Sequence, residues 1–201
     1  VSTKAVKMIP GKVKRLHGTT RFDTNIAVLK EAGVSDEDVA ICYAYNFADA
    51  LSVSAAGVPV LLVDEALNET QKEELASLKS KKYFLIGGKQ AVSDKVESEV
   101  SKYGNTERIA GNNRFETSRA IAERFFSGEQ EKVYLTYGYN FPDGLCAGAL
   151  CATKGNPLLL VSNENMAEAK SYIEKAKVKS CVVLGSEKLI SDKAVMSILK
   201  K

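Results

Sequence analysis

The sequence predicts an α/β fold made of two tandem Rossmann-like modules, each a short parallel sheet flanked by helices. The chain repeats itself, because Arg15 aligns with Arg108 and Leu85 aligns with Val183, at offsets of 93 and 98 residues. In each copy, short apolar runs alternate with amphipathic stretches. The apolar runs are nearly continuous, which is typical of parallel strands that are covered on both faces.

The repeat consists of four sequence blocks that recur in the same order. They are RLHGTTRFDT and RIAGNNRFET, YNFADAL and YNFPDGL, VPVLLVD and NPLLLVS, and LIGGKQAVSDK and VLGSEKLISDK. Blocks in a fixed order indicate duplication of a whole structural unit. We therefore predict one module at residues 12–104 and a second at residues 105–201.

The elements of the first module follow in chain order. Phe22, Ile26 and Leu29 recur at helical spacing and predict a helix over 22–32. Apolar and partly β-branched runs predict strands at 39–43, 58–63 and 83–86. Ser93 is typical of a helix start, so a last helix is expected to follow it.

The second module repeats this order. A helix is predicted over 115–126, followed by strands at 133–137, 157–161 and 181–184 and by a last helix after Ser191. The offset rises from 94 at Leu145 to 98 at Asn156, so the second copy carries four extra residues there. This insertion corresponds to about one helical turn.

Composition and charge exclude several classes of protein. The 28 basic and 25 acidic residues give a net charge of +3 with no basic stripe, so no nucleic-acid partner is predicted. No run of about 20 apolar residues occurs, so no membrane insertion is predicted. The four cysteines form no CxxC pair and His17 is the only histidine, so no metal site and no cofactor are predicted. Buried free thiols are the expected state of Cys42, Cys146, Cys151 and Cys181.

The repeated YNF block holds the first candidate binding residues. It follows a predicted strand and leads into a helix, and ligands of parallel sheets bind beyond the carboxyl ends of the strands. Asn46 and Asp49, with Asn140 and Asp143 in the second copy, therefore line a polar ligand site or cap the helix that follows. Both interpretations stay open at this point.

Arg21 and Arg114 are the second pair of candidates. Each precedes a predicted helix, and a guanidinium there can bind the phosphate or carboxylate of a ligand in bidentate fashion. The structural alternative is an ion pair with Asp49 or Asp143.

No residue is predicted to be catalytic. His17 occurs only in the first copy, where the second has Ala110, and no GxSxG motif is present. Gly87 and Gly88 resemble half of a phosphate-binding turn, but the second copy has Gly185 and Ser186, and no complete nucleotide motif occurs. Repetition of a modest site is typical of a binding array, so we predict that the chain is not an enzyme.

Together the blocks RxxGxxRF[DE]T, YNF[AP]D[AG]L, P[VL]LLV and [VI]SD resemble the type 2 cell-wall-binding repeat of Gram-positive surface proteins. The resemblance runs from about Lys12 to Lys201. It implies a non-catalytic, exported anchor of S-layer and other surface proteins, located extracellularly at the cell wall. It also implies binding to an anionic, teichoic-acid-like secondary wall polymer, with the arginines meeting phosphate or carboxylate groups and the Asn and Asp side chains meeting sugar hydroxyls.

The resemblance has a further implication for assembly. Members of that family usually carry three modules packed as a pseudo-threefold ring, whereas this sequence contains two. A homo-oligomer or a third module is therefore expected to complete the pseudo-trimer.

Two other functions remain open from the residues alone. A phosphosugar- or nucleotide-binding enzyme or sensor would use the crevice of one Rossmann-like module and would have a single asymmetric site. An adhesive repeat would instead show exposed apolar patches.

Overall fold

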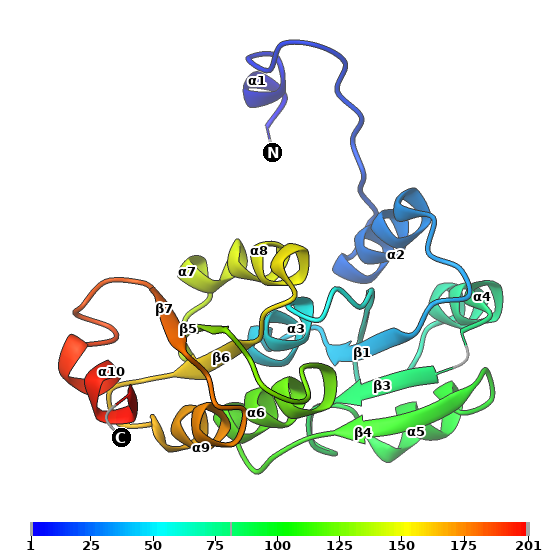
Figure 1. Ribbon diagram of the computed structural model, residues 1–201. Helices are drawn as coiled ribbons and strands as arrows, with labels where there is room; N and C mark the ends of the chain where they lie inside the picture. The colour runs from blue at the N-terminus through cyan, green and yellow to red at the C-terminus, as the bar shows by residue number, and fades with distance from the viewer. Residues whose placement is uncertain (1, 81, 200–201) are drawn as a thin grey trace.

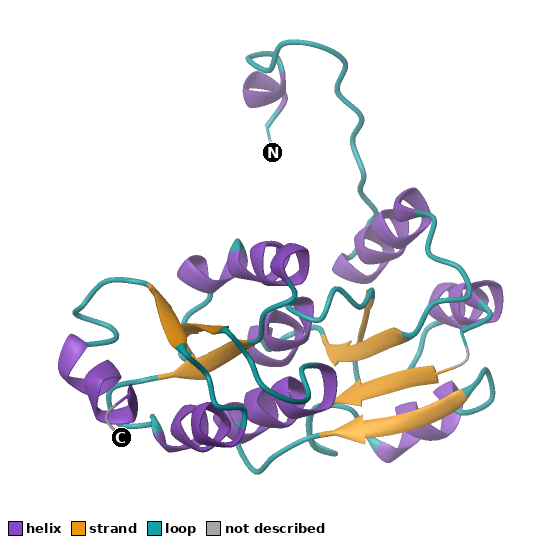
Figure 2. Cartoon of the chain, viewed as in Figure 1, coloured by secondary structure: helices purple, strands orange, loops and turns teal. Residues whose placement is uncertain are grey.

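The computed structural model describes residues 2–80 and 82–199, and it contains two parallel sheets (Figures 1 and 2). The first sheet has the strand order β2-β1-β3-β4, and the second has the order β6-β5-β7. The strands are β1 Val39–Tyr43, β2 Val60–Val63, β3 Lys82–Ile86, β4 Asn105–Ile109, β5 Lys132–Tyr137, β6 Leu158–Val161 and β7 Ser180–Leu184. The predicted α/β class with two parallel sheets is confirmed.

Ten helices are present in the described residues. They are α1 Thr3–Val6, α2 Arg21–Ala32, α3 Phe47–Ser54, α4 Glu69–Leu78, α5 Asp94–Val100, α6 Arg114–Phe125, α7 Pro142–Leu145, α8 Ala147–Lys154, α9 Ala167–Lys175 and α10 Asp192–Leu199. Ser93 caps α5 as predicted, because its hydroxyl accepts a hydrogen bond from the Val96 amide. Ser191 plays the same part before α10, accepting from the Ala194 amide.

The four-residue insertion changes one helix of the second copy. The first copy has the single helix α3, whereas the second has α7 and α8, which meet at Cys146. This junction leaves the Cys146 side chain exposed, so the prediction of a buried thiol is wrong there. Cys42 and Cys151 are buried and Cys181 is partly buried.

Each sheet is covered by helices on both of its faces. One face of the first sheet packs against α2, α4 and α5 through residues such as Leu29, Leu75 and Val96. The equivalent face of the second sheet packs against α6, α9 and α10. Burial on both faces explains why the strands are apolar throughout rather than alternating.

The helices α3 and α6 contribute to the cores of both modules. On α6, Ile121 packs in the core of the first sheet, while its neighbour Ala122 packs in the core of the second. On α3, Val53 faces the first sheet and Leu51 packs with residues of the second. The two modules are therefore joined by shared apolar packing.

The strand β4 was not predicted from the sequence. It begins at Asn105, directly after the predicted module boundary, yet it pairs in parallel with β3 of the first sheet. A strand of the second repeat thus completes the sheet of the first. The boundary between 104 and 105 stays a prediction, and the predicted end of the second module at 201 lies outside the described residues.

Two absences apply to the described part of the chain. No helix there is long and apolar enough to span a bilayer. No cluster of three or more His, Cys, Asp or Glu side chains in residues 2–80 and 82–199 is arranged to hold a metal ion.

Candidate functional site

The glycine and threonine of the first repeated block shape the turn before a helix. The Gly18 amide donates to Thr24 Oγ1 over 3.0 Å, and the Gly111 amide donates to Thr117 Oγ1 over the same distance. A Cβ on Gly111 would lie 2.2 Å from the Cβ of Glu116, so a side chain is excluded there. The block therefore needs glycine for close packing of the turn on the helix.

The arginine of the same block joins it to the YNF loop. Arg21 Nη1 donates to the Ala44 carbonyl over 2.8 Å, and its guanidinium lies 4.2 Å from the centroid of the Tyr45 ring. In the second copy, Arg114 Nη1 donates to the Gly138 carbonyl over 2.7 Å and lies 5.2 Å from the Tyr139 ring centroid. This contact gives a physical reason why the two blocks occur together.

The alternative of an ion pair within one module is not observed. Among the described residues, no ion pair joins Arg21 to Asp49 or Arg114 to Asp143. Arg114 instead reaches back to the first module, where its guanidinium lies 5.6 Å from the Phe47 ring centroid. Its positive charge also acts on Asp49.

The two asparagines differ in their local roles. Asn46 is the N-cap of α3, and its Oδ1 accepts a hydrogen bond from the Ala48 amide over 3.1 Å. Asn140 accepts from the Phe141 amide, but α7 begins with Pro142 and has no side-chain cap. The capping interpretation therefore holds for the first copy only.

Asp49 lies in the first turn of α3 and is 8% exposed. Burial raises the pKa of its carboxyl from 3.8 to about 6, although the nearby positive charge of Arg114 acts to lower it. Gly87 has φ +99°, and a Cβ there would lie 2.5 Å from Asp49 Oδ2. Because Gly87 has no side chain, the carboxylate of Asp49 can lie beside the end of β3.

A cleft of about 510 Å³ opens at this point, between the two modules. It is lined by Tyr43, Asn46, Ala48, Asp49, Gly87, Gly88, Lys89, Gln90, Ala91, Gly111, Asn112, Asn113, Arg114 and Thr117. The carboxyl ends of β1 and β3 supply one wall, and the turn that begins α6 supplies the other. This is the location where parallel sheets bind ligands.

The cleft brings three of the six candidate residues together. Asn46 and Asp49 come from the first module and Arg114 from the second. Arg21, Asn140 and Asp143 do not line it. Lys89, Gln90, Asn112 and Asn113 also line the cleft, although sequence reasoning did not select them. Their position in the sequence next to the Gly87-Gly88 turn or to Arg114 is the signal that could have identified them.

Asp143 occupies the equivalent position on the second sheet but has different surroundings. A Cβ on Gly185 would lie 3.1 Å from Asp143 Oδ2, just as a Cβ on Gly87 would lie close to the carboxylate of Asp49. Asp143 is nevertheless exposed. The turn before α6, which carries Arg114, covers Asp49, whereas no turn of the described residues covers Asp143 in the same way. The two copies therefore place this aspartate at the same point of the repeat but give it different surroundings.

The lining of the inter-module cleft suits a polar, multivalent ligand. Arg114 and Lys89 can bind phosphate or carboxylate oxygens, and the amides of Asn112 and Asn113 can both donate and accept. Binding of phosphate, carboxylate and hydroxyl groups is the chemistry that these residues can provide.

Known proteins resemble this chain at three levels. A family model for the cell wall binding domain 2 (CWB2) matches residues 15–97 and 108–195. The N-acetylmuramoyl-L-alanine amidase LytC of Bacillus subtilis is 25% identical over 194 residues, which cover 94% of this chain and 38% of LytC. An amidase enhancer of the same organism is 29% identical over 172 residues, covering 83% of this chain and 23% of the enhancer.

A solved structure agrees in fold. Cwp8 from Clostridium difficile superposes with a TM-score of 0.84 at 24% identity, over 97% of this chain and 34% of Cwp8. The chain thus spans well under half the length of these proteins.

Proposed function

The chain belongs to the cell wall binding domain 2 family, and on this premise we propose that its inter-module cleft binds an anionic, teichoic-acid-like secondary wall polymer. The family consists of cell-wall-binding domains of surface proteins, so the chain acts at the cell wall, on the cell surface. The choice of polymer and of cleft is the proposed part.

The observation that carries the proposal is the mixture of groups in one open cleft. Arg114 and Lys89 supply positive charge for the phosphate groups of a polymer. Asp49 has no hydrogen-bond partner among the described side chains, so its carboxylate is available to accept from a sugar hydroxyl. A polymer of alternating phosphate and sugar units presents both kinds of partner.

The proposal assigns anchoring rather than catalysis to this chain. Its two relatives from Bacillus subtilis are an amidase and an amidase enhancer by name, and the chain covers 38% and 23% of them. We assign the part that they share with this chain to wall attachment. In that arrangement, weak contacts repeated along a polymer add up through effective concentration.

Co-sedimentation with purified Gram-positive cell walls tests the proposal. Walls are used before and after acid extraction of their anionic polymers, over a series of salt concentrations. We expect extraction to abolish sedimentation of the protein and rising salt to weaken it, because exposed charges are screened. Unchanged binding to extracted walls would contradict the polymer assignment.

A matched pair of variants tests the cleft itself. Lys89→Gln removes a cation that lines the cleft, whereas Lys95→Gln removes an exposed cation six residues along that does not. We expect the first to weaken wall binding several-fold and the second to leave it unchanged. Equal effects would indicate that net charge, and not the cleft, determines binding.

A further inference from the structure

The cleft between the modules is lined by charges of both signs. Asp49 is its acidic side chain, and Lys89 and Arg114 are its basic ones. Charged groups that are taken out of water in a protein are usually paired with an opposite charge. Whether these three side chains pair within the protein therefore decides what the cleft offers to a ligand.

Asp49 has no partner within the described residues. Its side chain makes no hydrogen bond and no ion pair there, although the residue is only 8% exposed. In residues 2–80 and 82–199, the side-chain oxygens that are sealed from solvent without a partner belong to Glu74, Ser80 and Thr136. The oxygens of Asp49 are not among them, so its unpartnered carboxylate reaches solvent through the cleft.

Arg114 is held apart from Asp49 by other contacts. Its Nη1 donates to the Gly138 carbonyl over 2.7 Å, and its guanidinium lies 5.2 Å from the Tyr139 ring centroid and 5.6 Å from that of Phe47. In the described chain, no acidic side chain forms an ion pair with it. Its positive charge still acts on Asp49 through space. The cleft thus keeps two opposite charges apart instead of letting them neutralise each other.

Lys89 differs from these two residues because it is already paired. Its Nζ lies 2.9 Å from Asp94 Oδ1, and the two side chains are 70% and 68% exposed. Solvent screens an exposed pair of this kind. Lys89 therefore attracts anions to the cleft without fixing where they bind.

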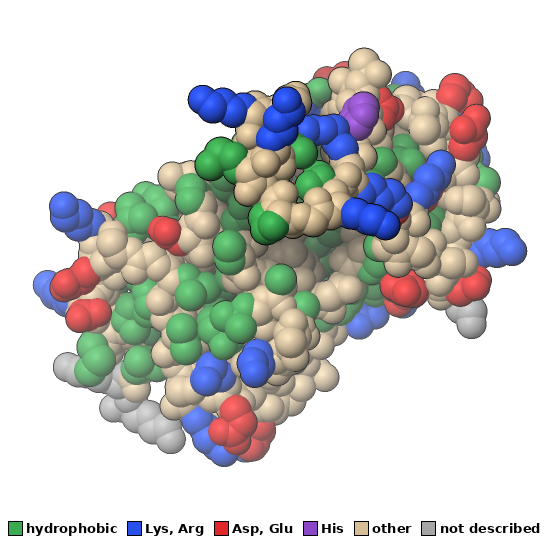
Figure 3. Space-filling view, turned by 90° about the horizontal axis from the view of Figure 1, so that it is seen from above, with side chains coloured by type: hydrophobic (Ala, Val, Ile, Leu, Met, Phe, Trp, Pro, Cys, Tyr) green, Lys and Arg blue, Asp and Glu red, His purple; other side chains and the backbone are tan. Residues whose placement is uncertain are grey.

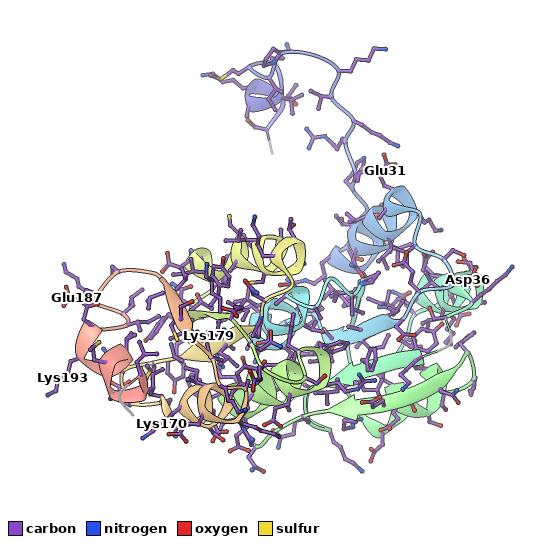
Figure 4. The ribbon with its side chains drawn as sticks, viewed as in Figure 1. Glu31, Asp36, Lys170, Lys179, Glu187 and Lys193 are labelled. Carbon is purple, nitrogen blue, oxygen red and sulfur yellow. The ribbon has the colours of Figure 1, made fainter. Side chains whose placement is uncertain are left out.

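Charges elsewhere on the surface are also exposed and mixed in sign. Figure 3 shows basic and acidic side chains interspersed over one face of the molecule. Figure 4 shows Glu31 and Lys193, two exposed charged residues, extending outward from the fold. Salt screens such charges within about 10 Å. Recognition of one repeating unit of a polymer therefore depends on the charges inside the cleft.

A ligand that satisfies both Asp49 and Arg114 carries both signs of charge. Phosphate suits a guanidinium, because its oxygens accept two parallel hydrogen bonds. An ionised carboxylate only accepts hydrogen bonds, and a protonated amine is a donor that also neutralises its charge. A purely anionic unit would be attracted by Arg114 and repelled by Asp49.

We propose that the cleft recognises a zwitterionic repeating unit, in which a protonated amine binds Asp49 and a phosphate binds Arg114. The ligand class rests on the proposed function of the cleft and specifies it further: the wall polymer carries amino groups beside its phosphates. Burial raises the pKa of the Asp49 carboxyl from 3.8 to about 6, so this carboxyl is ionised at neutral pH and can bind an amine.

Two small phosphates of equal length test the amine. Aminoethyl phosphate presents an ammonium where hydroxyethyl phosphate presents a hydroxyl. Binding of each to isotope-labelled protein is measured by NMR titration at neutral pH. We expect the aminoethyl compound to bind about fivefold more tightly or better, because hydrogen bonds between charged groups are about twice as strong as those between neutral groups. Equal or tighter binding of the hydroxyethyl compound, or binding of neither at millimolar concentrations, would overturn the proposal.

Substitutions locate this preference within the cleft. Asp49→Asn keeps an oxygen that accepts from a hydroxyl but removes the charge that binds an ammonium. We expect this variant to lose the preference for aminoethyl phosphate, whereas Asp143→Asn retains it because Asp143 does not line the cleft. Arg114→Ala is expected to weaken binding of both compounds. A preference that survives in Asp49→Asn would show that the amine binds elsewhere and would overturn the proposal.

Competition by the polymer itself separates the amine from the polymer assignment. Acid-extracted wall polymer, with free amines verified by a colorimetric assay, is N-acetylated or mock-treated and then competes with unextracted walls in co-sedimentation. Acetylation removes the positive charges and leaves the phosphates, so we expect the acetylated polymer to compete several-fold less well. Equal competition would refute the role of the amine and leave the proposed function intact. Competition by neither sample would contradict the polymer assignment itself.

Discussion

Replacing Asp49 by asparagine is expected to stabilise the protein at neutral pH. Asp49 is 8% exposed, and burial raises the pKa of its carboxyl from 3.8 to about 6 against the opposing charge of Arg114. Each pH unit of difference between the folded and unfolded pKa corresponds to about 1.4 kcal/mol, so holding this charge at pH 7 costs the fold about 3 kcal/mol. Asparagine keeps the shape and removes the charge, and the free energy of unfolding should rise by up to that amount.

The pH dependence of this effect has a definite sign. Between pH 3.8 and about pH 6 the folded protein holds a proton on Asp49 that the unfolded chain has lost. The free energy of unfolding of the wild type therefore falls as the pH rises through this window, and the full cost is present above it. The Asp49→Asn variant lacks this contribution, so its advantage grows from none below the window to its maximum above it.

Urea unfolding followed by circular dichroism, in buffers that cover this window and neutral pH, measures the effect. Asp143→Asn is the matched control, because Asp143 holds the same place in the repeat but is exposed. We expect a large, pH-dependent stabilisation for Asp49→Asn and almost none for Asp143→Asn. Equal stabilities of the two variants at pH 7 would refute the assignment of a buried, costly carboxylate. A residue that reduces stability in this way is typical of a site kept for binding.

Two further substitutions test the local structure. Gly87→Ala places a Cβ at φ +99°, 2.5 Å from Asp49 Oδ2, and should lower the free energy of unfolding by about 1 to 3 kcal/mol in urea titrations, whereas Gly88→Ala meets no atom within 4 Å and should cost far less. Ser118→Ala removes a fully buried hydroxyl that accepts from the Leu160 amide over 2.9 Å, and should cost about 1 to 3 kcal/mol in the same assay. Equal losses for the two glycine variants, or an unchanged midpoint for Ser118→Ala, would contradict these contacts.

The sequence predicted six of the seven strands because these strands are buried on both faces. Continuous apolar runs located β1, β2 and β3 and their second-copy counterparts to within two residues. The strand β4 was missed because NTERI carries little apolar character at a sheet edge, where one side of the strand has no partner. Its pairing with β3 depends on how the modules pack, and no local pattern encodes that.

In the candidate site too, local sequence patterns predicted some residues, while others depend on how the modules pack. Asn46 and Asp49 were predicted from their place after a strand, and they line the cleft. The repeat suggested that each arginine serves its own module, whereas Arg114 lies in a cleft with residues of the preceding one. Cross-module contacts of this kind follow from the shared packing of α3 and α6 and could not be read from spacing alone.

Wall binding by Arg114→Ala, compared with Arg21→Ala, tests the central claim most directly. Both arginines donate to a loop carbonyl and stack on a tyrosine, but only Arg114 lines the inter-module cleft. The comparison uses co-sedimentation with unextracted walls at protein concentrations where light scattering shows monomers. We predict that Arg114→Ala weakens binding about tenfold or more while Arg21→Ala binds as the wild type does. Equal binding of the two variants would contradict the claim that the cleft between the modules is the polymer site.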